Sequence, residues 1–91
     1  MNVSIQNCTA ILHAEFVGHS FNVIVDAVAI DSRSLQNSDT TLFFALVGPN
    51  NDAHFYIKEL IDKGVQHFVV THIPEDCQGK ANFLIVQNTL V

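Results

Sequence analysis

The chain has 91 residues, the length of one small domain or of one part of a larger protein. Apolar residues make up 48% of it and charged residues only 14%, which is the composition of a folded globular chain. The formal charge is −5, and the four basic residues are scattered, whereas a nucleic-acid binder needs clustered Lys and Arg against the phosphates. These values exclude a DNA or RNA partner, but not a small phosphate ligand, because backbone N–H groups can hold phosphate.

The sequence shows neither a targeting signal nor a metal-ligand spacing. No apolar run approaches the roughly 20 residues that span a bilayer, and the N-terminus lacks a basic segment followed by an apolar one. We therefore expect a cytoplasmic protein without a membrane partner. In that compartment Cys8 and Cys77 are expected as reduced, partly buried thiols. No metal site is expected, since His67 and His72 share a short segment without a further ligand pair at suitable spacing.

The N-terminal part predicts a helix followed by a hairpin. Ser4 is a suitable N-cap for a short amphipathic helix within residues 4–14. Its apolar face consists of Ile5, Cys8, Ile11 and Leu12. After a turn at 18–20, the β-branched residues of 21–30 indicate a strand. We expect a hairpin that joins 16–17 to 23–25.

The middle of the chain carries the clearest signals. A polar loop over 31–40 leads into TLFFALVG at 41–48, an apolar run typical of a strand buried on both faces. Asp52 is a good N-cap for a helix that ends near Gly64, a typical C′ residue. Its expected apolar stripe consists of Phe55 or Ile57, then Leu60 and Ile61.

Two further strands are predicted, at 66–71 and 82–87. The strand–helix–strand run from about 41 to 71 predicts a right-handed βαβ unit with parallel strands. The fold class is therefore α/β: a small mixed β-sheet flanked by helices, with an N-terminal helix plus hairpin, in one domain over 1–91. Because Asn88 is placed to cap another helix, we expect the chain to be a fragment of a longer protein.

Motifs for an autonomous active site are not found in the sequence. It contains no P-loop, no dinucleotide-binding glycine fingerprint and no Gly-x-Ser-x-Gly elbow. Two loops remain as candidates, Asp31–Arg33 and Gly48–His54, each expected after a strand. Ligands of α/β sheets bind outside the carboxyl ends of strands, and the helix N-terminus after the second loop favours an anion such as a diphosphate.

Structural roles explain the same residues equally well. Asp31, Ser32 and Arg33 fit a polar turn with a surface ion pair. Asp52 fits a helix cap, and His54 fits an exposed position on the first helical turn. From these patterns alone, the prediction is a small α/β domain with one good anion-binding loop.

At these loops the sequence resembles the N-terminal domain of the MurE and MurF ligases. The stretch IDSRSLQNSDTTLFFALVGPNNDAHFYIKELIDKG at 30–64 shows the family's Asp-Ser-Arg, polar spacer, apolar strand, Gly, brief loop and Asp-Gly/Ala-His. The resemblance extends to the predicted strands at 66–71 and 82–87. Ala53 replaces the Gly common in MurE, which favours MurF.

The resemblance implies a three-domain, ATP-dependent amide ligase of peptidoglycan biosynthesis, and hence of cell-wall biogenesis and cell shape. The first domain holds the UDP end of UDP-N-acetylmuramoyl-peptide, for MurF the tripeptide form to which D-alanyl-D-alanine is added. A central domain binds ATP and Mg²⁺, so that no cofactor and no catalytic residue are expected in this fragment. In some bacteria a MurF-like ligase is fused to an alanine racemase.

Carried over by position, the resemblance assigns UDP-binding residues to both loops. Ser32 is the best candidate for contacting the uridine diphosphate, and Arg33 would anchor its loop, by an ion pair with Asp31. The uracil side would be lined by Pro49, Asn50 and Asn51. Asp52 is expected to cap the helix, and His54 to support the loop or approach the ligand.

Two departures from the family pattern concern the loops. Pro49-Asn50-Asn51 is an unusual loop sequence, and the spacer 34–40 lacks the usual Gly before the strand. Two alternatives stay open: a free-standing nucleotide-ligand-binding or interaction module without ligase activity, and an unrelated α/β domain whose loops mimic the motif.

Overall fold

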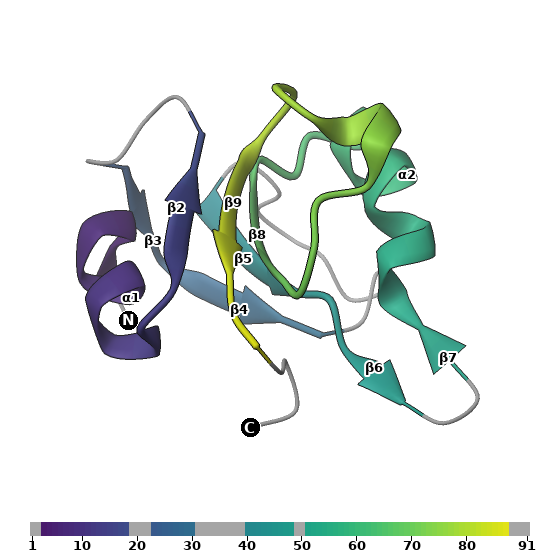
Figure 1. The fold of residues 1–91 in the computed structure, drawn as a ribbon. Helices are drawn as coiled ribbons and strands as arrows, with labels where there is room; N and C mark the ends of the chain where they lie inside the picture. Colours follow the sequence, from purple (N-terminus) through teal and green to yellow (C-terminus); the bar gives the residue numbers. More distant parts are fainter. Residues whose placement is uncertain (1–2, 19–22, 31–39, 49–50, 88–91) are drawn as a thin grey trace.

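The structure is a computed structural model that describes residues 3–18, 23–30, 40–48 and 51–87 (Figure 1). Its elements, in chain order, are β1 (Val3–Ser4), α1 (Ile5–Leu12), β2 (Glu15–Val17), β3 (Ile24–Val25), β4 (Ala27–Ala29), β5 (Thr41–Phe44), β6 (Val47–Gly48), β7 (Asn51–Asp52), the 3-10 helix η2 (Ala53–Tyr56), α2 (Ile57–Asp62), β8 (His67–Val70), the 3-10 helix η3 (Glu75–Cys77) and β9 (Asn82–Ile85). Within these ranges no helix is long and apolar enough to cross a membrane.

A five-stranded mixed sheet organises the described residues, in the order β2-β9-β8-β5-β4. The strands β4, β5, β8 and β9 are parallel to one another, and β2 is antiparallel to β9 at one edge. The unit β5–α2–β8 confirms the βαβ prediction for 41 to 71. Phe43 of β5 lies opposite Phe68 of β8 in the parallel register.

Side chains alternate between the two faces of this sheet and form two cores. The larger core lies on the α2 side, where Phe43, Phe68 and Phe83 pack with Ile57 and Leu60. The smaller core lies on the α1 side and contains Ile5, Val25, Leu42, Val69 and Leu84. The helices α1 and α2 cover opposite faces in Figure 1, so β5 is buried on both sides as its apolar run predicts.

Both helix starts follow their predicted caps. The Ser4 side chain accepts a hydrogen bond from the Asn7 N–H at 3.1 Å, which caps α1. Asp52 caps the second helical segment, which begins as the 3-10 turn η2 before α2. Gly64, with a φ of 103°, ends α2 as predicted. Its N–H donates to the Ile61 carbonyl, and the next N–H reaches the Leu60 carbonyl, the pair of bonds of a Schellman motif.

The predicted hairpin between 16–17 and 23–25 is wrong. Strand β2 pairs with β9, with Phe16 opposite Leu84, whereas β3 pairs with β1. The chain changes partner at Asp26, whose N–H donates to the Thr40 carbonyl, and so the β-branched run at 23–29 divides between two sheets. Pairing with β9 places Phe16 against the α1-side core.

Candidate functional site

The carboxyl ends of β4, β5, β8 and β9 lie along one edge of the sheet, because these strands are parallel. We call this edge, with the short β6–β7 ladder that follows β5, the carboxyl edge (Figure 1). In the ladder Val47 pairs with Asp52 and Gly48 with Asn51. Helix η2 begins directly after the ladder. Ligands of α/β proteins bind at this edge of the sheet, outside the carboxyl ends of the strands.

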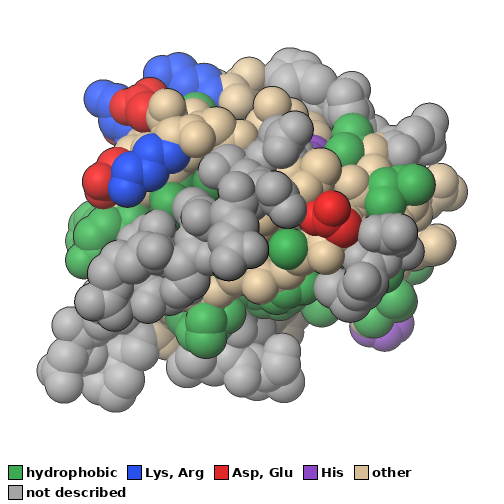
Figure 2. Space-filling model, turned by 180° about the vertical axis from the view of Figure 1, so that it is seen from behind, with side chains coloured by type: hydrophobic (Ala, Val, Ile, Leu, Met, Phe, Trp, Pro, Cys, Tyr) green, Lys and Arg blue, Asp and Glu red, His purple; other side chains and the backbone are tan. Residues whose placement is uncertain are grey.

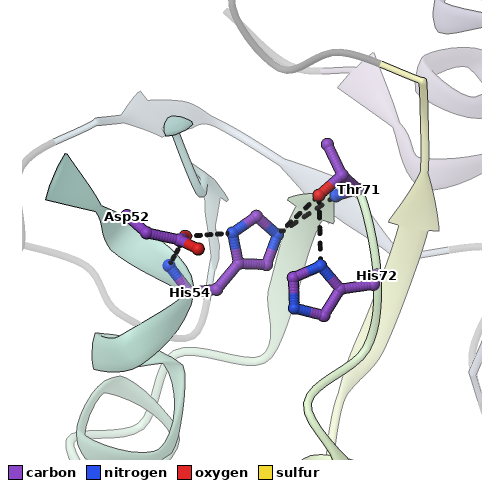
Figure 3. Close-up of polar contacts among 4 residues, drawn as sticks. All are labelled: Asp52, His54, Thr71 and His72. Atoms are coloured by element: carbon purple, nitrogen blue, oxygen red, sulfur yellow. Dashed lines mark hydrogen bonds and ion pairs between the residues drawn. The ribbon is translucent and has the colours of Figure 1, made fainter. Parts of the chain in front are cut away.

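Asp52 makes two hydrogen bonds to His54 (Figure 3). The His54 backbone N–H donates to Asp52 Oδ1 at 2.9 Å, and Nδ1 of the His54 ring lies 2.6 Å from the same oxygen. One carboxylate therefore caps η2 and also orients the His54 ring. The predicted capping role of Asp52 is confirmed.

The other ring nitrogen of His54 reaches across to β8. The Thr71 backbone N–H donates to His54 Nε2 at 3.1 Å. An amide N–H can only donate, so Nε2 carries a lone pair and the proton of a neutral ring sits on Nδ1, facing Asp52. Both ring nitrogens are engaged, which leaves His54 no free lone pair for proton transfer.

Two neighbouring groups complete the cluster. The rings of His54 and His72 are stacked, with centroids 4.3 Å apart and an interplanar angle of 9°. Thr71 Oγ1 lies 3.2 Å from His72 Nδ1 and 3.4 Å from His54 Nε2. We call Asp52, His54, Thr71 and His72 the histidine cluster (Figure 3). It joins η2 to the end of β8.

Burial and pairing shift the titration of two cluster members. Desolvation lowers the pKa of His54, and the opposing attraction of Asp52 does not offset it. Burial alone would raise the pKa of Asp52, but the hydrogen bonds from His54 outweigh it and leave that pKa below its usual value. The cluster therefore favours a neutral His54 beside an ionised Asp52 at neutral pH.

The structure brings together part of the predicted site. Asp52 and His54 lie side by side, and Asn51 belongs to β7, with only its backbone described. The proposed UDP contacts of Ser32, Arg33, Pro49 and Asn50 lie outside the described residues. The alternative that His54 lies exposed is wrong, because its exposed fraction is 5%.

Sequence reasoning missed Thr71 and His72. A signal for Thr71 was available: the predicted βαβ unit places the end of the strand at 66–71 beside the end of the strand that feeds the Asp52 loop. No spacing pattern pointed to His72, because stacking of two rings 18 positions apart depends on the exact path of the chain after β8.

The lysine side chains of the described residues gather on one part of the surface. Figure 2 shows them beside acidic side chains at the upper left of the face that it presents. Among the described residues, Lys58 is on α2, Lys63 follows it, and Lys80 precedes β9. Lys63 pairs with Glu59 at 3.4 Å across one helical turn. An exposed pair of this kind contributes little to stability.

Comparison with known proteins gives the class of the fold. No family model matches the chain, and a search of curated proteins found no match. Among solved structures, the fold corresponds to a part of the Mur ligases.

The particular neighbours are MurF enzymes. Two crystal structures of MurF from Acinetobacter baumannii align with TM-scores of 0.79 and 0.80 at 18% identity. A structure of UDP-N-acetylmuramoylalanyl-D-glutamyl-2,6-diaminopimelate–D-alanyl-D-alanyl ligase from the same organism aligns with 0.79, also at 18% identity. Each alignment covers 98% of this chain and 19% of the other, so the chain spans about a fifth of their length. This likeness establishes the fold.

Proposed function

We propose that the chain is the substrate-binding domain of a MurF-type amide ligase. It would hold the UDP moiety of UDP-N-acetylmuramoyl-tripeptide while other parts of the ligase attach D-alanyl-D-alanine. The observation that carries this proposal is the coincidence of a MurF-like fold with an Asp-Ala-His motif placed at the carboxyl edge.

The topology supports assigning both loops to one site. In the sequence, Asp31-Ser32-Arg33 follows Ile30, the residue directly after β4, and the other loop follows β5. The strands β4 and β5 are parallel neighbours, so both segments leave the sheet at adjacent strand ends. In the proposal Ser32 contacts the diphosphate, and the uracil side is lined by Pro49, Asn50 and Asn51. Arg33 anchors the first loop.

ATP and Mg²⁺ would be held by other parts of such a ligase. The described ranges contain no group of three His, Cys, Asp or Glu side chains that could hold a metal ion, and the sequence has no P-loop. The proposal therefore leaves both cofactors to other parts of the ligase. The part of this chain in the reaction is to bind and orient the nucleotide end of the substrate.

An NMR titration of the labelled chain tests the proposal with UDP and with UDP-N-acetylmuramoyl-tripeptide. We expect shifts at Ser32, Asn50, Asn51 and the start of η2. Ser32→Ala and Asn50→Ala should each weaken UDP binding by ~1–2 kcal/mol through a lost polar contact. Gln66→Ala, at an exposed position before β8, is the matched control and should bind normally. Absence of shifts with both ligands would contradict the proposal.

A further inference from the structure

We propose that His54 is the positioning residue of the carboxyl edge: its Nε2 lone pair couples η2 to the end of β8, and this coupling sets the affinity for the uridine nucleotide. The second half of the inference rests on the proposed function, whereas the first half does not. His54 is 17 positions from Thr71 in the sequence, so their hydrogen bond is a tertiary link. The two Asp52 bonds, by contrast, are local.

The link joins parts of the chain that the sheet does not pair. The β6–β7 ladder forms a two-stranded sheet of its own, separate from the sheet that contains β8. The ladder and η2 are continuous in the chain, because Asp52 ends β7 and Ala53 begins η2. A hydrogen bond from Thr71 to His54 therefore restrains the ladder relative to β8. In the sequence, the proposed UDP residues Pro49 and Asn50 come between Gly48 of β6 and Asn51 of β7.

The bond requires the neutral ring. A proton on Nε2 would face the Thr71 N–H, and two donors cannot bond to each other. Among the described residues, the titratable groups that act on the His54 ring are Asp52 on β7 and His72 after β8. Asp52 keeps its contact with Nδ1 in both charge states, whereas a charged His72 would repel a charged His54. Protonation of His54 therefore breaks the bond from the Thr71 N–H and leaves the Asp52 contact in place. The protonated Nε2 keeps only the longer contact with Thr71 Oγ1, at 3.4 Å, which holds β8 less tightly.

Two substitutions separate the two ring contacts. In His54→Asn the amide nitrogen takes the place of Nδ1 and can donate to Asp52, but nothing reaches Thr71. In His54→Gln the side-chain oxygen can take the place of Nε2 and accept from Thr71. We expect His54→Asn to weaken UDP binding about five- to tenfold, as loss of one hydrogen bond predicts, and His54→Gln to recover most of the affinity. The matched control is His13→Asn, at the left-handed C-cap of α1, where Asn is tolerated.

The pH dependence adds a readout that a purely structural role would not change. Wild-type affinity should fall as the pH drops below the ordinary histidine range, whereas His54→Gln should not share that fall. UDP itself takes up a proton near pH 6, so the ratio of the two affinities at each pH is the quantity to measure. A ratio that stays constant from pH 7.5 to 5, or equal affinities of His54→Asn and His13→Asn, would overturn the affinity half of the inference.

A ligand-free experiment tests the coupling by itself. Ring ¹⁵N correlations should show His54 protonated at Nδ1 only, and hydrogen exchange at the Thr71 amide should be faster in His54→Asn than in His13→Asn. Protonation at Nε2, or equal exchange rates, would overturn the coupling. If the wild-type chain keeps the coupling but does not bind UDP, then the proposed function is wrong. The claim that the coupling sets the UDP affinity is then wrong as well, whereas the coupling itself stands.

Discussion

The smaller core on the α1 side gives the most quantitative prediction. Leu42 has an exposed fraction of 2% and packs in the cluster with Ile5, Val25, Val69 and Leu84. Leu42→Ala removes three carbon atoms from the centre of this cluster. Measured Leu→Ala costs in well-packed cores are about 2.7–5 kcal/mol, from the lost transfer free energy plus the cavity that remains.

This loss is large for a chain of this size. At roughly 0.05–0.15 kcal/mol per residue, the free energy of unfolding of a 91-residue domain is about 5–14 kcal/mol. A loss near 3 kcal/mol would remove a fifth to more than half of it. Phe44 is only half-buried, so Phe44→Ala should cost less than Leu42→Ala.

Urea unfolding followed by far-ultraviolet circular dichroism provides the assay, since the chain has no Trp. The midpoint should fall in Leu42→Ala while the slope stays unchanged, which marks a pure stability change. Ile11→Ala is the matched control, because Ile11 is apolar but 71% exposed and should cost within about 0.5 kcal/mol. If both variants lose the same free energy, then the assignment of Leu42 to a packed core is refuted.

Two further predictions concern stability. Acid should lower the free energy of unfolding in two steps. Folding lowers the pKa values of His54 and Asp52, so as the pH falls the unfolded chain binds a proton at each residue before the folded chain does. The His54 step begins as the pH falls below 6.5, its ordinary pKa, and the Asp52 step begins near and below 3.8. In pH-dependent urea unfolding, His54→Gln should remove the upper step, and its persistence would contradict the assignment. Gly64→Ala should cost about 1–2 kcal/mol, since a φ of 103° strains any residue with a Cβ. An unchanged thermal midpoint for this variant would argue against the Schellman end of α2.

Local features of the fold were predictable from the sequence because they depend on neighbouring residues. Ser4 and Asp52 follow the chemistry of helix caps, and Gly64 follows the left-handed geometry of a helix end. The βαβ unit follows from an apolar strand, an amphipathic helix and a second strand at ordinary spacing.

Partner choice was not predictable in the same way. Phe16-Val17 fits a hairpin with 23–25 as well as it fits the edge beside β9, because alternation of side chains specifies a face and not a neighbour. The site was likewise predictable only in part. The motif located Asp52 and His54, whereas the bond to Thr71 depends on how far β8 extends before the chain turns.

The pairing of β2 with β9 has a consequence for how the chain acquires its fold. One partner comes from the beginning of the sequence and the other from its end, so this contact has a high sequence separation. The βαβ unit can form as soon as residue 70 is available, but β2 has its partner only once residues 82–85 of β9 are present. Closing such a long loop is slow compared with forming local structure. During synthesis on the ribosome, therefore, the docking of β2 onto β9 is expected to complete the sheet last.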